Sequence, residues 1–281
     1  MRFFIVDVFA ERKYSGNQLG MFVLDRDAET SELQQIAKEL HFSECTFVRP
    51  GLRDGGFDVR IFTPDMEVPF AGHPTLGTAF AIRELLHWSD APTITLNLGV
   101  GQIPVAFNAG MLTMQQKQPT FGPSIDRRAL EDILGVEEID DRFPVEVVST
   151  GLPSVIVPLT SLDALQRCRI DHERYARFLR DVSKSAILVF TPLNDIRVRV
   201  FVDDEGFFED PATGSANGNL AAWFLRHHYF ACTAIKYRVE QGFELGRPSI
   251  LEIAASEEHG SYEIRVGGRV VPVAQGTLYE V

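Results

Sequence analysis

The segment FEDPATGSANGNLAAWFL, from Phe208 to Leu225, decides how this chain is interpreted, because a second version of it stands in the first half. That version is PFAGHPTLGTAFAI, from Pro69 to Ile82. Each version follows a short strand-like run that ends in Phe, VRIF at residues 59–62 and VRVF at residues 198–201. Each then has a turn, a Gly-X pair and an apolar stretch with helical character. The sequence therefore predicts that one structural device occurs twice.

The two Gly-X pairs are Gly72-His73 and Gly214-Ser215. A glycine ahead of a helix lets the backbone approach a ligand closely, and the first N–H groups of a helix favour an anion because they have no internal partner. Two such helix starts predict two anion-binding elements that face one cleft, and thus an enzyme. The alternative is a pair of well-capped helices, with Ser215 or Thr213 as the capping residue and nothing bound.

Length and composition indicate a globular protein, since 281 residues with 45% hydrophobic content accommodate two domains of ordinary size. The net charge of −12 argues against nucleic acid or an anionic membrane as partner. A small anionic substrate stays possible, because helix ends and a His can outweigh distant surface charge. The three cysteines (Cys45, Cys168 and Cys232) lack metal-binding spacing, and their odd number fits a reduced, cytoplasmic protein. The N-terminal apolar run is too short for a signal peptide, and no stretch approaches membrane length.

The chain reads as two copies of one plan, with the divide at QPTFGPSID, Gln118 to Asp126. This predicts domains at residues 1–117 and 118–265. The expected elements of the first copy are strands at Phe3–Phe9 and up to Leu24, a helix opened by Ser31, strands FSECTFVRP and DVRIF, and the Gly-His helix. Those of the second are a strand–turn–strand at Val145–Leu159, a helix at Asp171–Val182, a strand at Ser183–Phe190, VRVF, and the Gly-Ser helix.

Strands dominate both copies, so an α+β fold is expected rather than an alternating Rossmann sheet. The lone GVG within Leu98–Gln102 precedes Ile103-Pro104-Val105, which reads as a strand. It is therefore not the fingerprint of a dinucleotide-binding helix.

Duplicated halves that build one site show their chemistry where the two copies differ. Ser43-Glu44 in the first copy corresponds to Ser185-Ala186 in the second. Glu44 stands among apolar residues, and a partly desolvated carboxyl with a raised pKa can take and return a proton near neutral pH. The alternative is a strand-edge glutamate that faces water. The pairing with the two helix starts makes Glu44 a candidate base.

Three further polar residues are candidates, each with a structural alternative. His73 follows Gly72 directly and can cap the helix or address a ligand. Asp210 precedes a proline, which restricts it to extended conformations and favours a turn, so it can also serve as a cap. Asn17, in SGNQLG, can simply be the turn residue. The combination of these residues with Glu44, rather than any one of them, predicts a site.

These motifs resemble the PhzF-like proteins, named for the phenazine-biosynthesis isomerase, within the diaminopimelate epimerase fold. The resemblance runs nearly end to end. It rests on SGNQLG (15–20), SECTFV (43–48), FAGHPTLGTAF (70–80), EDPATGSANG (209–218) and EQGFELGRPS (240–249). One departure is visible, because Gln18 stands where the family more often has proline.

The resemblance implies two similar domains, each a mixed, curled sheet around a central helix, with the active site in the cleft between them. It also implies that the C-terminal segment, about residues 266–281, returns to the first domain, and that the protein is a homodimer. In the family, a glutamate that matches Glu44 shuttles a proton without a cofactor, while residues matching His73, Asp210 and Ser215 hold the substrate. We therefore predict the catalytic residues Glu44, His73 and Asp210 and the substrate-binding residues Asn17, Gly72, Gly214 and Ser215.

The epimerases of this fold use two cysteines, one just before each Gly-X pair, where this chain has Ala71 and Thr213. This argues against a two-thiol racemase. We expect a cofactor-independent isomerase that shifts a proton on a small carboxylated, cyclic or amino-acid-like substrate. The alternatives are an epimerase or racemase that uses Glu44 with another residue, and a non-catalytic binding protein. A metal held by His73 and Asp210 is not expected, because no third ligand stands at a suitable spacing.

Overall fold

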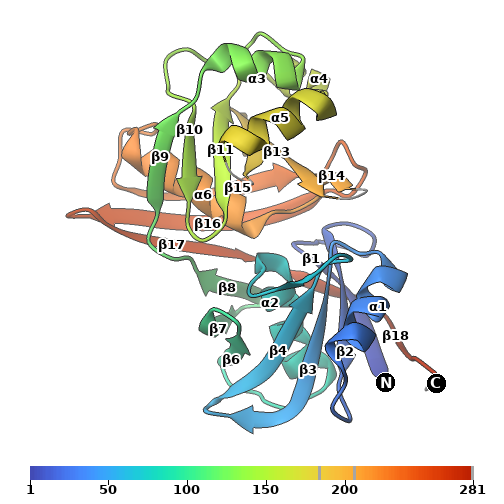
Figure 1. Ribbon diagram of the computed structural model, residues 1–281. Coiled ribbons are helices and arrows are strands. Elements are labelled where there is room, and N and C mark those ends of the chain that lie inside the picture. Colours follow the sequence, from blue (N-terminus) through green and yellow to red (C-terminus); the bar gives the residue numbers. More distant parts are fainter. Residues whose placement is uncertain (183–184, 205–206, 280–281) are drawn as a thin grey trace. The chain divides into compact units, whose positions relative to one another are not determined.

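The computed structural model describes residues 1–182, 185–204 and 207–279 and divides into two compact units (Figure 1). The first unit comprises Met1–Met114 and Gly267–Val281, and the second comprises Gln115–Val266. Strands predominate in both, so the expected α+β class is confirmed. Ser183 and Lys184, where a strand of the second copy was expected to begin, lie outside the described residues.

The first unit has a mixed sheet with a central helix, α2, and a second helix, α1. Its last strand comes from the C-terminal segment, because β18 pairs antiparallel with β1. The elements are β1 (Arg2–Val8), β2 (Asn17–Val23), α1 (Thr30–Leu40), β3 (Glu44–Arg53), β4 (Gly56–Phe62), β5 (Glu67–Val68), α2 (Gly72–Phe80), the π-helical turn η1 (Ala81–Leu85), β6 (Thr93–Leu98), β7 (Gly101–Asn108), β8 (Met111–Gln115) and β18 (Val270–Thr277).

The second unit repeats this arrangement and adds two helices, α3 and α4, that the sequence analysis did not predict. Its elements are β9 (Thr120–Ser124), α3 (Arg127–Leu134), β10 (Glu146–Ser149), β11 (Pro153–Pro158), α4 (Leu162–Arg167), α5 (His172–Val182), β12 (Ala186–Pro192), β13 (Ile196–Asp204), β14 (Phe207–Asp210), α6 (Gly214–Arg226), β15 (Ala234–Gln241), β16 (Ser249–Glu258) and β17 (Ser261–Gly268).

Strand pairing follows the same order in both units. In the first, β2 pairs antiparallel with β1 and parallel with β3, and β4 pairs antiparallel with β3 and parallel with β6. In the second, β11 pairs antiparallel with β10 and parallel with β12, and β13 pairs antiparallel with β12 and parallel with β15. The register matches as well, because Phe62 lies opposite Glu67 as Phe201 lies opposite Glu209. EVPFAGH (67–73) and EDPATGS (209–215) therefore occupy equivalent places.

Each sheet has a central helix on one face. The central helix α2 packs on β1, β2 and β3, and α6 packs on β10, β11, β15 and β16. Both are almost wholly buried, which explains their apolar, small-residue sequences. A separate core joins β2 and β3 to α1 in the first unit, and β11 and β12 to α3 and α5 in the second.

An arginine–glutamate pair and a proline–glycine contact hold the turn ahead of each central helix. Two-pronged hydrogen bonds join Arg60 to Glu67 and Arg199 to Glu209. Pro69 then lies against Gly99, where an added Cβ would come within 2.9 Å of the proline ring, and Pro211 lies in the same way against Gly242.

Gly242 has a φ of +74°, and an added Cβ would lie 2.5 Å from the carbonyl oxygens of both Pro211 and Arg247. Gly246 has a similar φ of +69°, but a Cβ there would meet nothing within 4 Å. Both substitutions by alanine strain the backbone, whereas only Gly242→Ala also forces backbone atoms apart. We expect Gly242→Ala to lower the free energy of unfolding by about 1–3 kcal/mol more than Gly246→Ala. Urea denaturation measures both values, and equal losses would contradict the close approach.

Candidate functional site

Glu44 is the first residue of β3, and its side chain lies on the face of the sheet that carries α2. Side chains alternate along a strand, so Glu44 and Thr46 share one face and Cys45 lies on the other. Thr46 accordingly contacts Thr78 of α2 through their hydroxyl groups, which lie 2.8 Å apart, whereas Cys45 belongs to the core with α1. Glu44 lies beside Leu19 of β2 in the parallel register, and its side chain is 20% exposed.

His73, the second residue of α2, lies next to Glu44. Its Nε2 is 3.2 Å from the carbonyl oxygen of Gln18 and 3.6 Å from Oε2 of Glu44. The contact with Gln18 is within hydrogen-bonding distance, whereas the contact with Glu44 is too long for a hydrogen bond. The ring is 5% exposed. The helix start is thus tied to β2 at the residue next to Leu19, which brings His73 and Glu44 together.

Burial lowers the pKa of His73 to about 3, although its hydrogen bond to the Gln18 carbonyl acts in the opposite direction. The ring is therefore neutral at physiological pH. A carbonyl oxygen can only accept, so Nε2 carries the proton and Nδ1 does not. His73 is thus a neutral hydrogen-bond donor beside the carboxyl group rather than its cationic partner.

The start of α2 has no side-chain cap, because Ala71 occupies the capping position and no side-chain cap bond forms there. Pro74 has no N–H, so the helix begins with the backbone N–H groups of Gly72 and His73. Asn17, the remaining predicted residue of this unit, is buried at the first position of β2. The first unit therefore brings Glu44 and His73 together at an uncapped helix start.

The second unit holds Asp210, Gly214 and Ser215. Asp210 ends β14, Thr213 is the N-cap residue of α6, and Gly214 and Ser215 begin that helix. Thr213 does not cap with its side chain, because its hydroxyl donates instead to Oδ2 of Asp210 over 2.5 Å. The alternative of two side-chain-capped helices is therefore wrong for both copies.

Gln241, the last residue of β15, organises this turn and was not among the predicted site residues. Its side chain is fully buried and hydrogen-bonds to Asp210, Thr213 and Asn217. The motif EQGFELGRPS contains it and was recognised only as part of a resemblance. Its burial and its partners are properties of the folded chain, so the sequence carried no separate signal for it.

The matched register shows where the two copies have diverged. Glu44 begins β3 as Ala186 begins β12, opposite Leu19 and Ser154 respectively. The pairs that differ in a polar group include Glu44/Ala186, Val68/Asp210, Ala71/Thr213, His73/Ser215 and Leu98/Gln241. Most of the predicted site residues are among them. The framework is duplicated, and the polar groups at these five positions are not.

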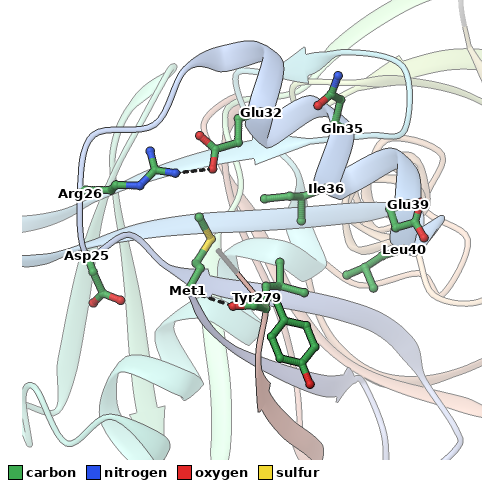
Figure 2. A pocket seen from close by; sticks show the side chains of 10 residues that line it. Met1, Asp25, Arg26, Glu32, Gln35, Ile36, Glu39, Leu40 and Tyr279 are labelled. Carbon is green, nitrogen blue, oxygen red and sulfur yellow. Dashed lines mark hydrogen bonds and ion pairs between the residues drawn. The ribbon is translucent and has the colours of Figure 1, made fainter. Parts of the chain in front are cut away.

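A pocket of about 520 Å³ lies elsewhere in the first unit, between α1 and the two chain ends (Figure 2). Arg26 and Glu32 form an ion pair at its edge, 2.7 Å apart. None of the predicted site residues lines it. Within residues 1–182, 185–204 and 207–279, no three His, Cys, Asp or Glu side chains are grouped as metal ligands would be. Among the helices of those same ranges, none has the length and apolar character needed to cross a membrane.

The family described as phenazine biosynthesis-like protein (PhzC-PhzF) matches residues 6–276. The chain belongs to this family. It is 34% identical to a trans-2,3-dihydro-3-hydroxyanthranilate isomerase of Pseudomonas aeruginosa over 99% of both proteins. It is 33% identical to an uncharacterised isomerase of Pasteurella multocida over 98% of this chain and 93% of that protein. The expectation of a PhzF-like isomerase is thus confirmed.

Solved structures agree with this assignment. The phenazine biosynthesis protein of the PhzF family from Bacillus anthracis superposes with a TM-score of 0.91 and 25% identity, covering 100% of this chain and 99% of that one. A probable proline racemase from Agrobacterium radiobacter shares the fold at 10% identity and a TM-score of 0.65, over 99% of this chain and 92% of that one. The fold is therefore the epimerase-like one that the motifs predicted.

His73 provides a test by titration. Its pKa in the folded protein, about 3, lies below the ordinary value of 6.5. Between these values the unfolded chain binds the additional proton, so this residue's contribution to stability is complete above pH 6.5 and is lost as the pH falls toward 3. In nitrogen-15 NMR we expect the His73 ring to remain neutral at pH 5, with the proton on Nε2. The unfolding free energy of His73→Asn should fall less than that of the wild type between pH 6.5 and pH 5. A ring that is protonated at pH 6 would contradict the neutral assignment.

Proposed function

We propose that this PhzF-family isomerase shifts a proton on a small carboxylated metabolite, cyclic or amino-acid-like, with Glu44 as the single acid/base group. The observation that carries the proposal is the position of Glu44, a partly exposed carboxyl group beside a neutral, buried His73 at an uncapped helix start. The substrate of the Pseudomonas aeruginosa relative, trans-2,3-dihydro-3-hydroxyanthranilate, is of this class and is the first compound to test.

In the proposed reaction the Glu44 carboxylate removes a proton from a carbon next to an unsaturated or carbonyl-like group. The electron pair of that C–H bond moves into the conjugated system. Glu44 then returns the proton to another carbon on the same face, so the substrate is rearranged with no net change in composition. A neutral imidazole beside the carboxylate leaves it available as a base, because it does not stabilise the charged form as a cation would.

The developing negative charge needs stabilisation, and oriented N–H groups supply it without reorganisation during the reaction. In the first unit we assign this role to the start of α2, at Gly72 and His73. Removing one such donor typically costs about 3–4 kcal/mol of barrier. The proton shift that we propose uses only groups of the polypeptide. The roles of Asn17, Asp210, Gly214 and Ser215 in substrate binding stay predictions from the family resemblance.

Cys45 is the neighbouring group that could be taken for a second base. Burial, and then the nearby charge of Glu44, raise the pKa of its thiol to about 12. The thiol therefore stays protonated at neutral pH, and it lies on the opposite face of β3, in the core with α1. This supports a one-base proton shift over a thiol-based racemisation. The homodimer and the cytoplasmic location remain predictions, which rest on the family resemblance and on cysteine usage respectively.

Glu44→Gln tests the base directly. The amide has nearly the same shape as the carboxylate but cannot accept a proton from carbon. With trans-2,3-dihydro-3-hydroxyanthranilate in heavy water, we expect the wild type to place deuterium on one carbon. In the Gln variant kcat should fall at least about 10²–10⁴-fold, with folding and binding nearly intact. Substantial turnover by Glu44→Gln would remove Glu44 from the mechanism, and inversion at a single centre would indicate an epimerase.

Cys45→Ala is the matched control, since it changes the adjacent residue on the other face of the strand. We expect turnover within about twofold of the wild type, because a protonated, buried thiol takes no part in the proposed reaction. His73→Ala should instead raise KM and lower kcat together, since its proposed role is to position the substrate. Steady-state kinetics separate these patterns, and a large loss of kcat in Cys45→Ala would favour a thiol base.

A further inference from the structure

Gln241 uses every hydrogen-bonding position of its side-chain amide on the turn ahead of α6. Its Oε1 accepts from the backbone N–H of Thr213 over 3.2 Å and from Nδ2 of Asn217 over 2.9 Å. Its Nε2 donates to the carbonyl oxygen of Asp210 over 2.8 Å and to Oγ1 of Thr213 over 3.1 Å. Two donors and two acceptors surround the amide, so only this orientation satisfies all four groups.

The hydrogen bond from Gln241 Nε2 to Thr213 Oγ1 determines where the Thr213 hydroxyl proton points. A hydroxyl group that accepts from Gln241 still has its own proton to donate, and Oδ2 of Asp210 lies 2.5 Å away. The result is a chain of hydrogen bonds from the Gln241 amide through the Thr213 hydroxyl to the Asp210 carboxylate. Gln241 therefore controls both the backbone and the side chain of Asp210.

The first copy shows that the fold does not need this chain. Leu98 stands where the second copy has Gln241, Ala71 where it has Thr213, and Val68 where it has Asp210. The proline–glycine contact and the helix start form in that copy nevertheless. The Gln241 amide, the Thr213 hydroxyl and the Asp210 carboxylate therefore occur together only in the second copy. The framework of the turn forms without them in the first.

We infer that Gln241 is a positioning residue, which acts through Thr213 to fix the Asp210 carboxylate as a hydrogen-bond acceptor of set orientation toward the substrate. This inference rests on the proposed function, in which Asp210 binds substrate. Substrate recognition in the second copy then depends on a glutamine 31 residues further along the chain.

Asn219 provides a control of the same kind, because it is another fully buried amide of the second unit. It accepts from the N–H and the hydroxyl of Thr150 and donates to Leu152 and Ser154. None of these bonds reaches Asp210. Gln241→Leu and Asn219→Leu remove four hydrogen bonds each, and the first installs the residue that the equivalent position of the first copy already has.

The first measurement needs no substrate. In crystal structures we expect the Asp210 carboxylate to leave Thr213 Oγ1 in Gln241→Leu and to keep that bond in Asn219→Leu. Thr213→Val, which removes only the hydroxyl, serves if Gln241→Leu does not fold, and it should displace the same carboxylate. Thr213→Ser keeps a hydroxyl group, so the Asp210 carboxylate should keep its wild-type position in that variant. An Asp210 side chain that stays in place in Gln241→Leu, or in Thr213→Val, would overturn the inference.

The second measurement is a double-mutant cycle with trans-2,3-dihydro-3-hydroxyanthranilate. We expect Gln241→Leu to lower kcat/KM by roughly 10–100-fold, as the loss of a hydrogen bond to a charged group does. In an Asp210→Asn background the same change should have little further effect, whereas Asn219→Leu should act independently. Additive losses for Gln241→Leu and Asp210→Asn would overturn the inference. Turnover retained by Glu44→Gln would instead overturn the proposed function, and the crystal structures would still decide the role of Gln241.

Discussion

The contact between a proline and a strand-end glycine fixes the turn ahead of each central helix, and the candidate site residues at the two helix starts depend on it. Pro69 lies on Gly99 and Pro211 lies on Gly242, close enough that no side chain fits between them. An arginine–glutamate pair holds each turn from its other side. With the turn held at two points, the first residues of α2 and α6 have defined positions relative to their own sheets. Such fixed positions are needed if the first residues of these helices are to bind a ligand in one defined geometry.

On this duplicated framework the arginine–glutamate pair is kept in both copies, whereas the polar groups at the candidate site positions differ. The first copy carries the carboxyl group of Glu44 and the imidazole of His73, and the second carries Ala186 and Ser215 in the same places. The second copy has instead Asp210, with the hydroxyl and the amide that hold it. A single base in one copy suits a proton shift, whereas a pair of opposed bases would suit racemisation. The asymmetry of the residues thus matches the isomerase class of the family.

Burial determines the chemical state of the residues around Glu44. The His73 ring is neutral because it is surrounded by protein, and the Cys45 thiol is protonated for the same reason. Neither residue is charged at neutral pH, although Cys45 follows Glu44 in the chain and the His73 ring lies beside the Glu44 carboxyl group. The net charge of the chain, −12, has little bearing on this local balance. This supports Glu44, rather than either neighbour, as the proposed acid/base group.

The sequence by itself determined the duplication, the class of the fold and the family, because these depend on local patterns that recur in a matched order. The Gly-X pairs predict both central helices. The helices α3 and α4 were missed: α3 follows a Pro- and Gly-containing stretch that reads as a linker, although Asp126 caps it, and α4 has only six residues.

Only the tertiary structure decided how the site groups are held. The sequence offered Thr213 or Ser215 as a cap, but the Thr213 hydroxyl donates to Asp210 instead, and Gln241 makes four hydrogen bonds to Asp210, Thr213 and Asn217. The neutrality of His73 likewise comes from its surroundings and not from its neighbours in the chain. Each of these properties is set by hydrogen bonds or burial between residues far apart in sequence, which no local pattern records.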